Sequence, residues 1–108
     1  MKQTTRALIA AVAAEKLSGH HVDRVYDHAH GEALAVTRHL LTEAAAQDAA
    51  EAVVLHLDAQ ERVSLQVHDD LFSGWDHVTG AYFAGAMVQS EVMLYDGYER
   101  RYYKFSVH

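Results

Sequence analysis

Residues 75–85 read WDHVTGAYFAG: an aromatic residue and an aspartate, three variable residues, a glycine, and then a partly alternating run. A related arrangement, with a large apolar residue first and either glycine or arginine at the sixth position, occurs three more times without a gap, as YDHAHGEALAV from residue 26, LDAQERVSLQV from residue 57 and YDGYERRYYKF from residue 95. Two positions align across the segments: Asp27, Asp58, Asp76 and Asp96 at one, and Gly31, Arg62, Gly80 and Arg100 at the other. The chain therefore repeats one local pattern four times.

The repeated pattern has the composition of a β-hairpin turn. A four-residue loop between paired strand ends is commonly built around a type I turn and closes on a residue with positive φ. The aspartate carboxylate can accept hydrogen bonds from N–H groups of its own loop. Gly31 and Gly80 adopt positive φ without steric cost, and Arg62 and Arg100 would adopt it at some cost. The four aspartates and the two glycines are therefore predicted to be structural residues of the turns.

The residues that flank the turns have the period of strands. Val63, Leu65 and Val67 alternate with polar residues, and Tyr103, Phe105 and Val107 do the same near the end of the chain. Residues 53–57 form a further strand-like run. Gln89-Ser90 is predicted to be a two-residue connection between two strands, which makes the C-terminal part a meander.

The N-terminal segment predicts a helix over about residues 4–17. Its alanine-rich composition has high helix propensity, and Thr4 or Thr5 can act as the N-cap. Leu8, Ile9, Val12, Ala13 and Leu17 form one apolar stripe, and Ser18-Gly19 provides a C-terminal signal. This helix is expected to cover one face of a sheet.

Residues 42–52, TEAAAQDAAEA, interrupt the strand pattern. Their composition is helical, and Asp48 with Glu51 could form a capping box. They contain no large apolar side chain, so we expect a short helix or a helical loop outside the core.

Composition narrows the class of protein. The 108 residues suit a single domain, 1–108, and the formal net charge of -6 argues against nucleic acid as a direct partner. There is no cysteine, which excludes disulfides and thiolate metal sites and favours the cytoplasm. No run of apolar residues is long enough to cross a bilayer, so no membrane association is predicted. No cofactor is predicted either.

These observations predict an α+β fold. An N-terminal helix packs on a mostly antiparallel β-meander of about four hairpins, over about residues 22–107. Barrel-like and sandwich-like arrangements of the sheet remain open, and a homodimer formed through an edge strand is an option.

The aromatic-Asp turns and the terminal YYKFSV resemble those of small bacterial and phage proteins that have an N-terminal helix, successive YDY-type hairpins and an aromatic-rich last strand. The resemblance covers residues 7–18, the turn at 26–27 and residues 74–107. It departs over residues 40–52, where an alanine-rich stretch replaces β structure. The resemblance implies this fold and carries no activity.

Nine histidines in 108 residues suggest a metal-binding alternative. His20, His21, His28 and His30 could converge on a metal ion from neighbouring turn and strand-end positions. The competing interpretation is that His28, His30 and His77 are polar loop residues. The sequence contains no metal-binding helix motif to decide between these interpretations.

Catalytic patterns are weak. Asp27-His28 and Asp76-His77 pair an acid with an imidazole, but adjacent turn residues usually point apart. The sequence has no nucleophile elbow and no phosphate-binding glycine loop. We therefore predict a protein that is not an enzyme.

The first candidate for a contact surface is a Tyr/Arg patch, Tyr98, Arg100, Arg101 and Tyr102, since such residues are enriched in interfaces. It predicts a small acidic interaction module. One version is a phage-type inhibitor that occludes a basic surface of a partner protein with its carboxylates, among them Glu43, Asp48, Glu51, Asp69 and Asp70. The alternatives are a histidine-rich metal-binding protein and a structural domain with no ligand.

Overall fold

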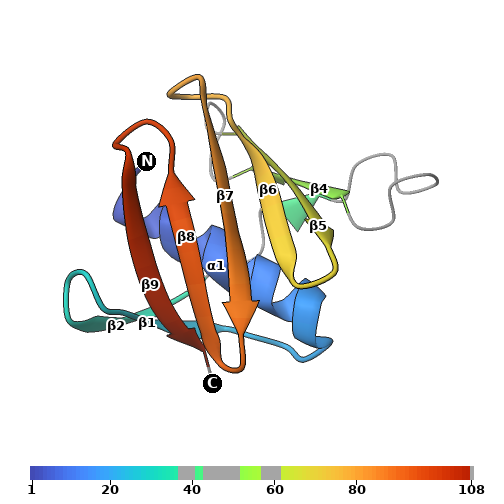
Figure 1. The fold of residues 1–108 in the computed structure, drawn as a ribbon, viewed down its shortest axis with the longest axis vertical. Coiled ribbons are helices and arrows are strands. Elements are labelled where there is room, and N and C mark those ends of the chain that lie inside the picture. Colours follow the sequence, from blue (N-terminus) through green and yellow to red (C-terminus); the bar gives the residue numbers. More distant parts are fainter. Residues whose placement is uncertain (37–40, 43–51, 57–61, 108) are drawn as a thin grey trace.

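The computed structural model describes residues 1–36, 41–42, 52–56 and 62–107, and the side chains of 1–36 and 63–107. These residues form one helix, α1 (Gln3–Ser18), and a nine-stranded antiparallel sheet, as Figure 1 shows. The strands are β1 (Arg24–Asp27), β2 (Glu32–Ala35), β3 (Leu41–Thr42), β4 (Ala52–His56), β5 (Arg62–His68), β6 (Leu71–Asp76), β7 (Ala81–Val88), β8 (Glu91–Asp96) and β9 (Arg101–Val107). The predicted α+β fold, with a helix packed on an antiparallel meander, is confirmed.

The strand order is β2-β1-β9-β8-β7-β6-β5-β4-β3. From β3 to β9 each strand pairs with its neighbour in the chain, and β1 pairs with β9, so the first strand lies beside the last. The sheet curves around α1, which contacts β1, β5, β7, β8 and β9. Over the described residues it does not close into a barrel, because β2 and β3 stand at opposite ends of the order.

α1 begins one residue earlier and ends one residue later than predicted. Its N-cap is Lys2, which makes no side-chain capping bond, so the prediction that Thr4 or Thr5 caps the helix is wrong. Thr5 is instead buried inside the helix. Gly19 ends the helix in the left-handed conformation with φ 77°, as predicted, and its N–H donates to the Glu15 carbonyl. Among the described residues, no helix has the length and apolar character that a membrane crossing requires.

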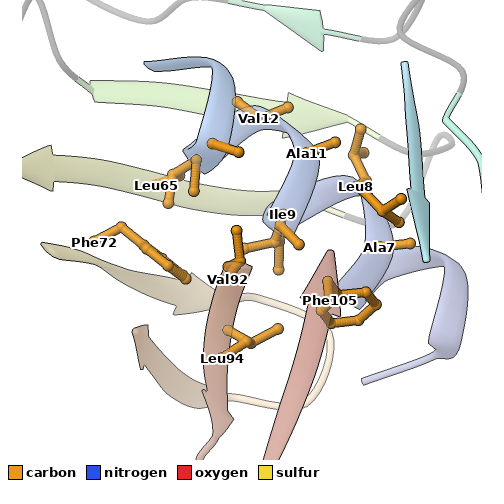
Figure 2. Packing of buried hydrophobic residues seen from close by; sticks show 14 of the residues in the cluster. Ala7, Leu8, Ile9, Ala11, Val12, Leu65, Phe72, Val92, Leu94 and Phe105 are labelled. Carbon is orange, nitrogen blue, oxygen red and sulfur yellow. The ribbon is translucent and has the colours of Figure 1, made fainter. Parts of the chain in front are cut away.

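α1 is buried on every side over residues 5–14, rather than along one stripe. The curved sheet surrounds it, and a helix in that position needs an apolar surface all round. Its many alanines allow the strands to approach closely. Figure 2 shows Ile9 of α1 directed toward Val92 of β8, with Leu65 and Phe72 of β5 and β6 on the same side of the helix.

The inner face of the sheet follows the predicted alternation. Val63, Leu65 and Val67 of β5 are buried, and so are Tyr103, Phe105 and Val107 of β9. Between these strands, β6, β7 and β8 contribute Phe72, Phe83, Val92 and Leu94 to the same core.

Two glycines lie beneath two phenylalanine rings at the centre of the inner face. Gly74 of β6 pairs with Phe83 of β7, and Phe72 of β6 pairs with Gly85 of β7. A Cβ on Gly74 would overlap the Ser64 carbonyl and the Phe83 ring, and a Cβ on Gly85 would overlap the Phe72 ring. Each ring therefore lies over the backbone of the glycine opposite, and this packing requires the absence of a side chain there.

Short connections join the strands at the other end from the aspartate turns. Gln89-Ser90 connects β7 to β8, as predicted, and Asp69-Asp70 connects β5 to β6 in the same way. Asp69 and Gln89 both have φ 57°. A positive φ at the first loop residue is a feature of type II′ hairpin turns, which match the twist of the flanking strands.

The predictions for residues 42–62 need correction. Thr42 lies in β3 and Ala52 in β4, so both ends of the predicted helical segment are strand, and residues 43–51 lie outside the described residues. Arg62 is paired with His56 as the first residue of β5, so it does not occupy the left-handed turn position that the repeat predicted. Asp58 lies outside the described residues. The segment that starts at Leu57 shares the composition of the other three but has a different strand register.

Candidate functional site

Asp27, Asp76 and Asp96 begin three turns of the same form, and all three are buried. The Oδ1 atom of each accepts a hydrogen bond from the N–H two residues later, at 2.9 Å in every case. Each aspartate carbonyl also accepts the N–H of the residue four positions on. Those residues are Gly31, Gly80 and Arg100, with φ of 66°, 70° and 58°. The predicted structural roles are confirmed for these three turns.

Two of the aspartate turns contact the N-terminal end of α1. The second carboxylate oxygen of Asp27 accepts Gln3 Nε2 at 3.0 Å and lies 2.8 Å from His30 Nδ1. Asp96 Oδ2 accepts the Met1 ammonium group at 3.1 Å. In Figure 1 the N-terminus accordingly lies beside the β8–β9 turn. Since α1 has no acidic residue in its own first turn, the carboxylates of the sheet supply the negative charge that a helix N-terminus favours.

Arg6 is a buried cation that completes this attachment. Its guanidinium lies 3.2 Å from Glu99 Oε2 and 3.7 Å from Asp96 Oδ2. It also stacks on the Tyr103 ring, with its central carbon 3.8 Å from the ring centroid. A buried charge that loses its partner strongly destabilises a folded protein. The contacts of Arg6 are therefore expected to hold the N-terminal end of α1 against the sheet.

Two pKa shifts report the same contacts. Burial alone would raise the pKa of Asp27, but hydrogen bonds from Gln3, His30 and the Ala29 N–H outweigh it, and the pKa lies below its ordinary value. Burial and the hydrogen bond that Tyr103 donates to Glu99 raise the pKa of the Tyr103 hydroxyl. Both groups therefore keep a fixed protonation state near neutral pH.

A cavity of about 290 Å³ lies between the start of α1 and two of the turns. It is lined by Met1, Lys2, Thr5, Val63, Asp76, Val78, Thr79, Tyr98 and Glu99. Val78 and Tyr98 occupy the same position in their respective turns, two residues after the aspartate, and both are exposed. The two carboxylates in the lining, Asp76 and Glu99, already accept hydrogen bonds within the protein.

The predicted histidine ligands do not converge in the structure. His28 Nε2 lies 2.7 Å from Ser106 Oγ, His30 contacts Asp27, and His21 Nδ1 lies 3.0 Å from Glu15 Oε1. His20 follows the end of α1 and is exposed. The described part of the chain contains no group of three or more histidine or carboxylate side chains that could hold a metal ion.

His77 and His28 occupy equivalent positions, each directly after a turn aspartate. His77 Nε2 lies 2.9 Å from Ser64 Oγ, which matches the contact between His28 and Ser106. Both pairs are exposed and join a turn to the adjacent strand. Each is a surface hydrogen bond of the repeated turn.

The predicted Tyr/Arg patch is divided between two places. Tyr102 lies on the outer face of β9, the face away from α1, and Tyr98 borders the cavity beside α1. Arg100 is a turn residue with positive φ, and the Arg101 guanidinium lies 5.4 Å from the centroid of the buried Tyr103 ring. These four residues therefore do not form one surface.

A different set of aromatic residues does form one surface. Trp75, Tyr82, Tyr95 and Tyr102 stand on the outer face of β6, β7, β8 and β9, and we call them the aromatic row. Trp75 pairs with Tyr82, and Tyr95 pairs with Tyr102. The ring centroids of Tyr82 and Tyr95 are 6.0 Å apart, and those of Tyr95 and Tyr102 are 4.9 Å apart. The aromatic row is therefore continuous across four strands.

Gly97 explains how Tyr82 reaches Tyr95. The equivalent residue in the other two turns is a histidine, His28 or His77. A Cβ on Gly97 would overlap the Tyr82 carbonyl and lie 3.1 Å from its ring. The Tyr82 ring thus occupies the space that a side chain would take in the other turns. Alternation within each strand, taken together with the hairpin registers, is the signal that places these four residues on one face.

The rest of the outer face of β6–β9 is also poor in charge. Its other side chains are small or aliphatic, Leu71, Ala84, Ala86, Val88 and Met93, together with serines. Its two charged residues are Glu91 and Lys104, whose charges lie 3.0 Å apart. In Figure 1 these strands lie in front of α1, and no element of the described chain covers their near side.

Antiparallel sheets that carry a helix on one face usually present polar side chains on the other. The outer face of β6–β9 departs from this pattern, and Trp75, Tyr82 and Tyr102 are 44%, 54% and 68% exposed. An exposed apolar surface of this kind marks a contact site. Comparison of the chain with protein-family models, with curated proteins and with solved structures finds no match, so the candidate site rests on this geometry: an aromatic contact face opposite the helix.

Proposed function

We propose that the chain is a small non-enzymatic interaction module of the cytoplasm that binds a partner protein through the outer face of β6–β9. The aromatic row is the observation that carries the proposal. Tryptophan and tyrosine dominate the residues that contribute most to protein–protein binding, because they bury a large area at a small entropic cost. Four such side chains on one face of four adjacent strands, three of them in ring contact, provide a centre for an interface.

The negative charge at the edge of this face favours a protein partner over nucleic acid. Asp69 and Asp70 are exposed at the β5–β6 turn, and the chain has a formal net charge of -6. These carboxylates would complement basic groups on a partner, as in the predicted inhibitor of a basic surface. Glu43, Asp48 and Glu51, which were expected to contribute, lie outside the described residues.

A capture experiment tests the proposal. The wild-type chain and the variant Tyr82→Ser/Tyr95→Ser are immobilised and exposed to extract from the cells that encode the protein, and retained proteins are identified by mass spectrometry. A partner is expected to be retained by the wild type and lost by the double variant. Its affinity, measured with purified protein, should fall by at least about tenfold, since truncating a central aromatic residue costs more than about 1.4 kcal/mol.

The control is Tyr98→Ser, which removes an exposed tyrosine outside the aromatic row. This variant should retain the partner. If Tyr98→Ser loses the partner and the double variant keeps it, the contact surface lies at the turn near α1 and the proposal is wrong. Failure of the wild type and Tyr98→Ser to retain any common protein at a signal above an empty support would also count against it.

A further inference from the structure

We infer that the partner of the aromatic row is a second copy of this chain, packed face to face through the outer sides of β6–β9. This inference rests on the proposed function, because it assigns an occupant to the same surface. Two sheets that pack in this way form a sandwich, in which side chains of the facing surfaces interdigitate over a thickness of about 10 Å.

The charge of the face points to a second copy. The chain as a whole carries a net charge of -6, so two copies repel each other through most of their surfaces. The outer face of β6–β9 is the exception, because Glu91 and Lys104 are its two charges and they cancel. Two such faces can meet without burying like charges.

The distribution of side chains on the face suits a twofold axis that runs across the strands. The aromatic row lies toward the aspartate turns, whereas Leu71, Val88 and Met93 lie toward the two-residue turns. Rotation about that axis places the aromatic half of one copy against the aliphatic half of the other. Aromatic rings then pack on aliphatic side chains in two equivalent places, as an isologous interface requires.

The registers give the contacts in more detail. In each copy Met93 pairs with Lys104, and Tyr95, two residues further along β8, pairs with Tyr102. The rotation brings Met93 opposite Tyr95 of the second copy and Lys104 opposite its Tyr102. A lysine ammonium over a tyrosine ring is a favourable cation–π contact. The small Ala84 and Ala86 between the two halves let the backbones approach.

Charge reversal tests the inference. Glu91→Lys gives the face two positive charges, and Lys104→Glu gives it two negative ones. Both residues are about half exposed, so neither change should unfold the chain. In sedimentation equilibrium across a concentration series, the wild type is expected to reach twice the chain mass and each single variant to remain at the chain mass. An equimolar mixture of the two variants should regain the doubled mass.

Asp23→Lys is the matched control, because it makes the same change of charge at an exposed residue before β1 and should leave the dimer intact. Circular dichroism confirms that each variant is folded. A wild type that stays at the chain mass into the millimolar range overturns the inference, and so does a dimer that survives both reversals or Tyr82→Ser. Those results leave the proposed function standing if the capture experiment shows a different protein that depends on the aromatic row.

Discussion

Neighbouring residues of β7 illustrate the difference between the two faces of the sheet. Phe83 is fully buried against α1 and lies over Gly74, whereas Tyr82 is 54% exposed and lies over Gly97. Each ring packs over a glycine. On the inner face the ring is part of the hydrophobic core, and on the outer face the ring remains accessible to solvent. Similar local packing can therefore serve stability on one side of a strand and contact on the other.

The largest expected effect comes from the buried ring. Phe83→Ala should lower the free energy of unfolding by about 4 kcal/mol, because it removes a fully buried aromatic side chain and leaves a cavity against α1. Urea denaturation followed by circular dichroism measures the change. A loss below about 1 kcal/mol would show that the inner face is not the core.

The glycine beneath that ring should be nearly as sensitive. Gly74→Ala should cost about 3 kcal/mol, because the new Cβ would overlap the Ser64 carbonyl and the Phe83 ring. Ser73→Ala is the control on the outer face of the same strand, and it should change the stability by less than about 0.5 kcal/mol. Equal effects of the two substitutions would contradict the proposed packing of Phe83 over Gly74.

The aspartate turns decide which residues face inward, since a slip of one residue would exchange Tyr82 and Phe83. Gly80→Val should cost more than about 1 kcal/mol, because φ at this position is 70° and valine disfavours it. Arg100 holds the equivalent position at φ 58°, so Arg100→Gly should stabilise the fold by about 0.5 kcal/mol. Thermal denaturation of both variants tests whether the two turns are equivalent.

The free energy of unfolding should depend on pH through Asp27, which lies on the inner face of the sheet. Its pKa in the folded protein lies below the ordinary value of 3.8, so its ionised form stabilises the fold above that pH, and the stabilisation is lost as the pH falls through the folded pKa. Asp27→Asn should therefore cost about 1 kcal/mol at neutral pH and progressively less in acid. Urea denaturation between neutral pH and about pH 2 measures the difference, with Asp70→Asn, at an exposed turn, as the control. A difference that stays constant over this range would exclude the ionised carboxylate as the cause.

The smallest expected effect is on the outer face. Tyr82→Ala should change the stability of the monomer by less than about 1 kcal/mol, because its contacts with Trp75 and Tyr95 are exposed cross-strand pairs. The measurement is made in the Glu91→Lys background, where association is expected to be absent. A cost close to that of Phe83→Ala would mean that the aromatic row is part of the core.

The local features of this fold could be predicted from the sequence. Asp76 and Gly80 satisfy the needs of a turn within five residues, and the alternation at Val63–Val67 indicates which side chains face inward. The repeat that starts at Leu57 shows the limit of this reasoning, because the composition of residues 57–63 matched the turn while the register at Arg62 did not.

The non-local features could not be predicted in the same way. In β6 and β7, each of two phenylalanine rings packs over a glycine of the other strand, and Tyr82 packs over Gly97. This packing depends on which residues lie opposite one another. The predicted Tyr/Arg patch grouped residues 98–102 because they are neighbours in the sequence. The turn places the side chains of Tyr98 and Tyr102 on different sides of the sheet. The aromatic row instead joins residues from four strands, and only the registers bring them together.

The pairing of β1 with β9 has a consequence for the order in which the fold can form. During synthesis α1 and β1 emerge well before β8 and β9, which contact α1. The alanine-rich helix therefore cannot bury its surface against these strands until β9 has left the ribosome. Contacts of such long sequence separation slow folding, and a chain truncated before β9 would leave β1 and β8 with unpaired edges open to aggregation.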